Sequence, residues 1–261
     1  MKRLLLLLLL ACTLPGAHAG QTCTVKKTSA RTFISAMNLA EKVRVTLESS
    51  QAEVALIARV GQDLSRFGLR YSHMAYVWRD HPKGRWLVVH ELNQCGTAHS
   101  ALFEQGLGNF FLDDMHAFDA VIVIPSRESQ ARIAAMLASD KPQRLHKRAY
   151  NMLSYAFSTQ YQNSNQWVLE TYAAASANDM HIANRSQAMS WLKLANYRPI
   201  TVDIPASTRL GARLFSANIA FDDHPFMRRA AGQIDTVTVE SVMRFVKQRE
   251  SESRELLITL N

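Results

Sequence analysis

The sequence predicts an α+β protein. Strand-like segments come first, at residues 53–60, 71–79 and 85–92, and helix-like segments are concentrated in the middle of the chain, around 126–139 and 164–175. A mixed segment of short helices and strands closes the chain. Strands that are grouped along the sequence, instead of alternating with helices, favour a small antiparallel sheet covered by helices.

The N-terminal half begins with a predicted helix over residues 30–50, which Ser29 can cap and in which apolar residues recur at helical spacing. The apolar run at 53–60 then predicts a buried strand that ends at Gly61. The turn-forming residues 80–84 join the next two strands. We therefore expect the first three strands to form an antiparallel meander.

The rest of the chain is less regular. Residues 93–114 contain three glycines and no clear period, which predicts a structured loop with a helical turn near 100–105. Further strands are expected at residues 118–124, 198–204, 234–239 and, at a sheet edge, 256–260. Helices are expected at residues 126–139, 145–157, 164–175, 186–194, 207–215 and 240–247.

The first residues have the pattern of an export signal. A positive pair at 2–3 precedes an apolar run at 4–10 and a small-x-small cleavage sequence at 17–19. We expect residues 1–19 to be cleaved and the mature protein to be periplasmic. The sequence before Cys12 also resembles a lipobox, but the short apolar run makes lipoprotein anchoring the less favoured alternative.

The mature chain, 20–261, is expected to form one α+β domain, of which residues 186–261 are either a part or a C-terminal extension. It keeps two cysteines, Cys23 and Cys95. In an oxidising compartment two cysteines are most simply a disulfide, with two separate thiols as the alternative.

Charge and motifs exclude several kinds of partner. The formal net charge is +8, and +6 remains after the signal takes Lys2 and Arg3 with it. The positive residues are scattered and form no stripe with aromatic residues, so we expect no nucleic-acid binding and at most peripheral membrane contact. The sequence has neither a Gly-rich phosphate loop nor zinc-ligand spacing, and we expect no cofactor or metal.

One short polar cluster, Asp222-Asp223-His224 before Pro225, leaves two interpretations open. Two carboxylates and an imidazole can ligate a metal or contribute to a site. Asp and Pro are also common turn residues, and a turn is the interpretation we favour.

Several strings resemble a bacterial family known as domain-of-unknown-function family 2145. They are the sequences GQDLS at 61–65, LRYSH at 69–73, HELNQCGT at 90–97, NFFLDD at 109–114, SNQW at 164–167 and AFDDHP at 220–225. This resemblance extends over nearly the whole mature chain, but it implies no established function.

A remoter resemblance connects the chain to the circularly permuted papain-like superfamily, which includes NlpC-type peptidases and relatives of lecithin:retinol acyltransferase. It depends on the strings YSHMAY at 71–76, VVH at 88–90 and NSNQWV at 163–168. The fold it implies is a small antiparallel sheet packed against a helical half that carries the nucleophile-position helix.

The papain-like resemblance also implies a site. Ser164 occupies the nucleophile position, His73 is the general base, and His90 or Glu91 orients His73. Because alternate residues of a strand point to opposite faces, only one of His90 and Glu91 can face His73, and the VVH string favours His90.

The departure from that pattern is a serine in place of the catalytic cysteine. A serine hydroxyl needs concerted removal of its proton by a base and an oxyanion hole. One hypothesis is therefore an exported hydrolase or acyltransferase acting on an amide or ester of the bacterial envelope. The alternative is a catalytically inactive protein that binds a peptide, glycan or acyl group, with Ser164 serving as a helix cap.

Overall fold

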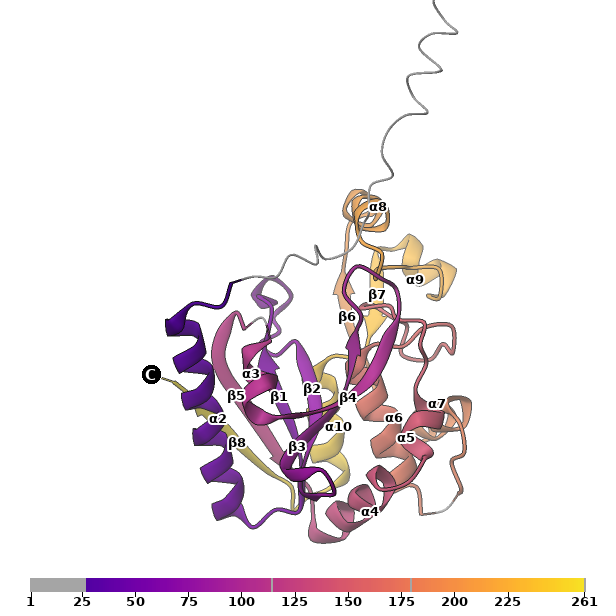
Figure 1. Cartoon of the computed structure of the whole chain (residues 1–261). Coiled ribbons are helices and arrows are strands. Elements are labelled where there is room, and N and C mark those ends of the chain that lie inside the picture. The colour runs from indigo at the N-terminus through magenta and orange to yellow at the C-terminus, as the bar shows by residue number, and fades with distance from the viewer. Residues whose placement is uncertain (1–26, 114, 179, 261) are drawn as a thin grey trace, which may run out of the picture.

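A six-stranded antiparallel sheet forms the centre of the molecule (Figure 1). The computed structural model describes residues 27–113, 115–178 and 180–260, and it has the α+β class expected from the sequence. In spatial order the strands are β4 (Ser100–Gly106), β3 (Gly84–Asn93), β2 (His73–His81), β1 (Val54–Val60), β5 (Ala117–Ile124) and β8 (Arg254–Thr259). The predicted meander of three strands is confirmed as β1, β2 and β3.

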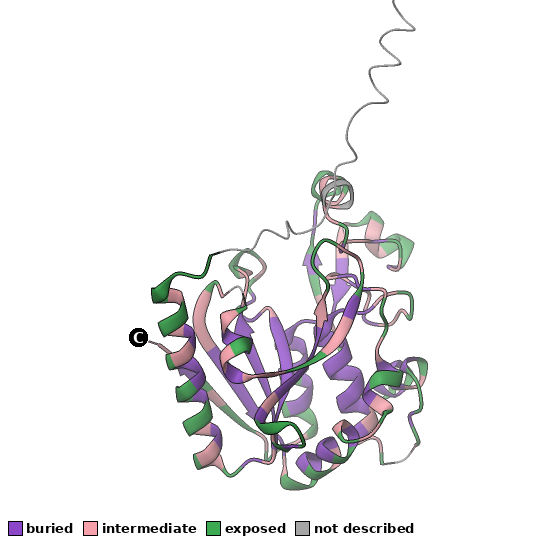
Figure 2. Ribbon diagram, viewed as in Figure 1, coloured by how far each residue is buried: buried purple, intermediate pink, exposed green. Residues whose placement is uncertain are grey.

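Helices cover both faces of this sheet. On one face lie α2 (Ala30–Ser50) and α3 (Leu107–Leu112), and on the other lie α4 (Arg127–Leu137), α6 (Ser164–Ser176), α7 (Arg185–Leu194) and α10 (Val239–Arg249). Alternation along β1 divides the core accordingly: Ile57 packs toward α2, whereas Leu56 packs toward α6. Figure 2 shows β1 and α6 buried along nearly their whole length, while α2 is exposed on its outer side.

The loop predicted for residues 93–114 is wrong in part. Residues 100–106 form β4, which pairs with β3 from Leu87–Gly106 to Asn93–Ser100, and α3 follows directly. β4 is an edge strand that is only partly buried, so its sequence lacks the alternation that marks a strand with one buried face. Pairing with β3, and not local propensity, makes this segment extended.

The helix predicted for residues 145–157 is also wrong. A short helix, α5 (Lys141–Leu145), ends there, and the chain then runs irregularly up to α6. Isolated bridges Tyr150–Gln162 and Tyr155–Thr236 hold this segment in place. The side chain of Asn151 supports the turn by accepting hydrogen bonds from the backbone of Leu153 and Ala220. The local sequence pattern gives no information about such tertiary partners.

A smaller sheet lies beyond the start of α6. It consists of β6 (Ile200–Asp203) and β7 (Gln233–Thr236), which pair antiparallel, and it is accompanied by α8 (Ala206–Phe215) and α9 (Phe226–Ala230). A 3₁₀ turn at Ser65–Phe67 lies between β1 and β2.

The segment from residue 186 onward shares the core of the preceding part. β8 pairs with β5 over its whole length, and Phe245 of α10 is buried in the same cluster as Trp167 of α6. The residues of the predicted export signal and Cys23 lie outside the described residues, so the signal and the disulfide to Cys95 both stay predictions. Within the described part of the chain, none of the helices has the length and apolar character needed to cross a membrane.

Candidate functional site

The candidate site lies at the end of the sheet where β2 and β3 diverge. The pairing between these strands stops at Tyr76 and Val89, which leaves the start of β2 without a partner on that side. The side chain of Asn165 in α6 takes the partner's place. Its Oδ1 accepts a hydrogen bond from the Met74 N–H at 2.9 Å, and its Nδ2 approaches the Ser72 carbonyl at 3.5 Å. The first turn of α6 is thereby tied to β2.

On the α3 face of the sheet lies a group that we call the imidazole cluster: Arg59, His73, His90 and Phe110. His73 Nε2 and His90 Nδ1 are 2.8 Å apart, and both rings pack on Phe110. Burial, reinforced by the positive charge of Arg59, lowers the pKa of His73 well below its ordinary value and that of His90 to about 3. Both rings are therefore neutral near pH 7, and one donates its proton to the other.

Arg59 is anchored by α3. Its guanidinium donates to the Phe110 carbonyl and to Asp113 Oδ2, the latter at 2.6 Å, and it lies 4.8 Å from the centre of the Phe110 ring. Burial is the main reason that His73 and His90 stay neutral, and the fixed positive charge of Arg59 beside them further disfavours the imidazolium form.

On the α6 face lies a second group, the Glu91 cluster: Glu91, Ser100, His146, Tyr150 and Ser164. Ser100 Oγ is 3.0 Å from His146 Nε2, and Glu91 Oε1 is 3.9 Å from the same nitrogen. The Glu91 side chain is fully buried, and neither of its oxygens has a hydrogen-bond partner within the described part of the chain. Burial, with a further contribution from Glu170, raises the pKa of Glu91 to about 8 against the opposing effect of Ser100.

Ser164 is the first residue of α6 but not its cap. Asn163 is the cap, and its Oδ1 accepts a hydrogen bond from the Gln166 N–H at 2.8 Å. Ser164 is buried and lies beside the Tyr150 hydroxyl. Burial raises the pKa of Tyr150 to about 12, although Ser164 works in the opposite direction. The group next to Ser164 is therefore a protonated phenol and not a base.

The structure brings only some of the predicted site residues together. It places His90 against His73 and turns Glu91 to the opposite face. It does not bring Ser164 to the imidazoles: His73 and His90 pack on Phe110 on the α3 face, and no hydrogen bond among the described residues joins Ser164 to either ring. The hypothesis of a His73–Ser164 pair therefore lacks a supporting contact.

A buried ion pair lies close to the Glu91 cluster. Arg185 Nε donates to Glu170 Oε2 at 2.7 Å, and both side chains are buried. Gln162 Nε2 donates to the same carboxylate oxygen at 2.6 Å. This arrangement fixes α6, α7 and the irregular segment before α6 relative to one another.

Comparison with known families decides the membership of the chain. A family model described as an uncharacterized protein conserved in bacteria, DUF2145, matches residues 46–246. The chain belongs to the DUF2145 family. No curated protein and no solved structure matches it. The resemblance to papain-like proteins therefore stays a prediction.

The DUF2145 match contains both polar clusters. It begins within α2 and ends within α10, so β8 lies outside the matched range. Since the family carries no assigned function, any function must be argued from the site itself.

In this DUF2145 protein the polar cluster at 222–224 serves a turn. His224 Nδ1 donates to Asp223 Oδ1 at 2.9 Å, and Asp223 Oδ2 accepts from the Tyr155 N–H at 2.7 Å. Asp222 accepts a hydrogen bond from Gln160. Within the described ranges, no group of three or more His, Cys, Asp or Glu side chains is arranged to hold a metal ion.

Sequence reasoning missed three members of the Glu91 cluster: Ser100, His146 and Tyr150. Ser100 falls in the segment expected to be a loop, and His146 and Tyr150 fall in the segment expected to be a helix. None of the three belongs to a motif with a fixed spacing, so no sequence signal could have identified them.

Proposed function

We propose that this DUF2145 protein is exported to the periplasm and binds a peptide, glycan or acyl component of the envelope without catalysing a reaction at Ser164. The observation that carries the proposal is the environment of Ser164, whose neighbouring polar group is the Tyr150 hydroxyl. A serine in place of the catalytic cysteine also favours binding over catalysis.

The chemistry of a serine nucleophile explains why this environment argues against catalysis. A serine hydroxyl becomes nucleophilic only when a nearby base takes its proton. Tyr150 holds its own proton at neutral pH because its pKa is raised to about 12. The neutral imidazoles of His73 and His90, which are the right kind of base, contact Phe110 on the other face of the sheet.

One observation favours a second candidate, a hydrolase or acyltransferase acting on an amide or ester. The distance of 3.0 Å between Ser100 Oγ and His146 Nε2 suits proton transfer between a nucleophile and its base. In that mechanism Ser100 Oγ attacks the carbonyl carbon while His146 Nε2 takes the hydroxyl proton, which then passes to the leaving group. Ser100 is only 2% exposed, so the binding proposal remains the better supported one.

Labelling with a serine-reactive fluorophosphonate, mapped by mass spectrometry, tests the proposal. We expect no adduct at Ser164 or Ser100 in the folded mature protein, while a known serine hydrolase in the same reaction is fully labelled. An adduct at Ser164 that disappears in His73→Ala would restore the original hydrolase hypothesis. An adduct at Ser100 that disappears in His146→Ala would instead establish the second candidate. A separate intact-mass measurement of the same protein checks cleavage after residue 19.

A further inference from the structure

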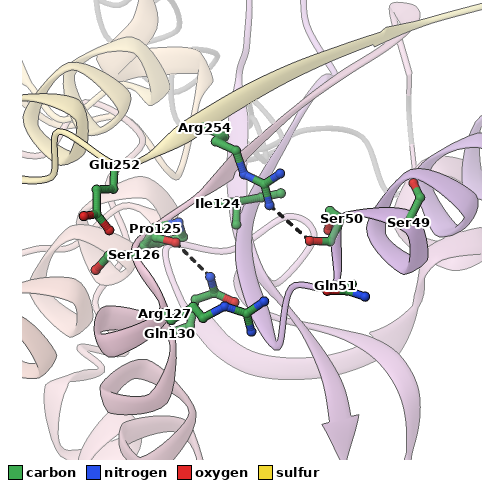
Figure 3. Close-up of a pocket in the computed structure, with 10 residues that line it drawn as sticks. All are labelled: Ser49, Ser50, Gln51, Ile124, Pro125, Ser126, Arg127, Gln130, Glu252 and Arg254. Carbon is green, nitrogen blue, oxygen red and sulfur yellow. Dashed lines mark hydrogen bonds between the residues drawn. The ribbon is translucent and has the colours of Figure 1, made fainter.

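A pocket of about 420 Å³ opens at the end of the sheet opposite the two polar clusters (Figure 3). Its walls come from the C-terminal end of α2, the turn from β5 into α4, and the start of β8. The lining residues are Ser49, Ser50, Gln51, Ile124, Pro125, Ser126, Arg127, Gln130, Glu252 and Arg254. Pockets for small molecules span about 300 to 1,000 Å³, so this one has room for a small ligand.

Two guanidinium groups reach into this pocket from different elements. Figure 3 shows the side chains of Arg254, from β8, and Arg127, from α4, among the residues that line the pocket. Arg254 Nη2 donates to the Ser50 carbonyl at 3.1 Å, and the other guanidinium nitrogens of Arg254 bind no residue in the described part of the chain. Within the described ranges, the side chain of Arg127 takes part in no hydrogen bond or ion pair. Glu252 is the one carboxylate among the lining residues, so their net charge is positive.

Several of the other polar groups of the walls are already engaged. The Ser126 N–H donates to Glu250 Oε2 at 2.8 Å, so the start of α4 serves an internal carboxylate. Gln130 accepts from the Glu53 N–H and donates to the Pro125 carbonyl, both at 2.8 Å. These bonds fix the walls and leave the two arginines as the charged donors that a ligand would meet.

We propose that this pocket binds a small phosphate monoester, held between the guanidinium groups of Arg127 and Arg254. Guanidinium groups present parallel N–H donors that match phosphate oxygens, and two of them match a dianion. The volume exceeds that of a phosphate group and leaves room for an organic substituent. This site is separate from Ser164 and the Glu91 cluster, so it goes beyond the proposed function and stands whether or not that proposal holds.

Calorimetric titration of the mature protein with inorganic phosphate and with glycerol 3-phosphate, at constant ionic strength, tests the site. We expect both to bind, and Arg127→Ala to weaken binding by about tenfold or more, because a hydrogen bond to a charged group is lost. Glu252→Gln should tighten binding severalfold because it removes the one negative charge from the lining. The matched control is Arg31→Ala, which removes the same charge at the N-terminal end of α2. From the helical rise per residue, Arg31 lies roughly 27 Å from the end of α2 that lines the pocket.

Two results would overturn the site. The first is the absence of binding by either probe. The second is an equal loss of affinity in Arg127→Ala and Arg31→Ala, which would mean that the overall positive charge and not the pocket attracts the anion. Vesicles containing phosphatidic acid, a lipid phosphate monoester, distinguish the source of the ligand. A soluble ester is indicated when glycerol 3-phosphate binds and the vesicles do not, and a lipid headgroup when Arg127→Ala also abolishes vesicle binding.

Discussion

Glu91 lies in the middle of the candidate site with its side chain fully buried and neither oxygen bonded to a described residue. Its neighbours Ser100, His146 and Tyr150 are polar but uncharged near neutral pH, and Arg185, whose positive charge acts on Glu91, is already paired with Glu170. A carboxylate in such surroundings is poorly solvated, so the proton is retained and the pKa rises to about 8.

The raised pKa predicts a specific pH dependence of stability. The folded protein keeps the Glu91 proton up to about pH 8, whereas the unfolded chain releases it near 4.5. Between these values the folded state binds more protons, so stability falls as pH rises, by roughly 1.4 kcal/mol per unit in the ideal case. Glu91→Gln should remove this slope and be more stable than the wild type at pH 8. Urea unfolding from pH 5 to 9 measures both proteins.

The matched control for the pH dependence of stability is Glu252→Gln, which alters an exposed carboxylate just before β8. Its stability should follow the wild-type pH profile. Parallel profiles for wild type and Glu91→Gln would contradict the assignment of the slope to Glu91.

At this scale the sequence identified some residues of the site and not others. Strand alternation predicted that only one of His90 and Glu91 could face His73, and the VVH resemblance favoured His90, which the structure places beside His73. The contact between Ser100 and His146 could not be predicted, because His146 is delivered by an irregular segment whose path depends on tertiary bridges.

At the scale of elements, the first turn of α6 binds both sheets. Asn163 caps the helix and also donates from Nδ2 to Thr236 Oγ1 of β7, at 3.1 Å, and to the Met152 carbonyl, at 3.2 Å. Asn165 joins the same turn to β2. The helix thus connects the large sheet to the small one.

This double role predicts an unusually costly cap. Asn163→Ala should lower the free energy of unfolding by roughly 2 to 4 kcal/mol, since it removes the cap and leaves buried partners unsatisfied. Asn184→Ala is the matched control: Asn184 caps α7 through the Gln187 N–H, is exposed, and should cost about 1 kcal/mol. Chemical denaturation compares them. Equal losses would mean that Asn163 contributes only as a cap.

The elements that were predicted correctly have a recognisable apolar pattern in their own sequence. In α2 the buried residues recur at helical spacing, and β1 and α6 are buried along nearly their whole length. β4 and the segment between α5 and α6 are held by partners elsewhere in the chain, and their local sequence carries little of that information.

At the scale of the whole molecule, the sheet extends beyond the region matched by the family. The match ends at residue 246, but β8 pairs with β5 over six residue pairs and buries Ile258 against the α2 face. β8 therefore covers the outer edge of β5, a strand of strongly apolar sequence that would otherwise be the edge of the sheet.

Removing residue 251 and everything after it should therefore destabilise the protein and promote association, although Glu250 and its bond to Ser126 are kept. Loss of the buried Ile258 side chain alone costs roughly 1.5 to 3 kcal/mol. We expect a fall in melting temperature of roughly 5 to 10 °C and the appearance of oligomers in light scattering. A truncated protein that stays monomeric with unchanged melting would show that β8 is dispensable.

The fold class and the meander were predictable at this scale, because grouped strands and capped helices are local signals. The last edge strand predicted at residues 256–260 is confirmed as β8, but its pairing with β5 was not predicted, since a short edge strand can pair with many partners.

The order of the strands also has a consequence for biogenesis. β5 emerges from the ribosome or the export channel nearly half a chain before β8, so its outer edge stays open until the last segment has been delivered. A protein exported as an unfolded chain would gain from this delay, because the sheet cannot be completed while translocation is still under way. During that interval the open edge of β5 is the place where a holding chaperone would be most useful.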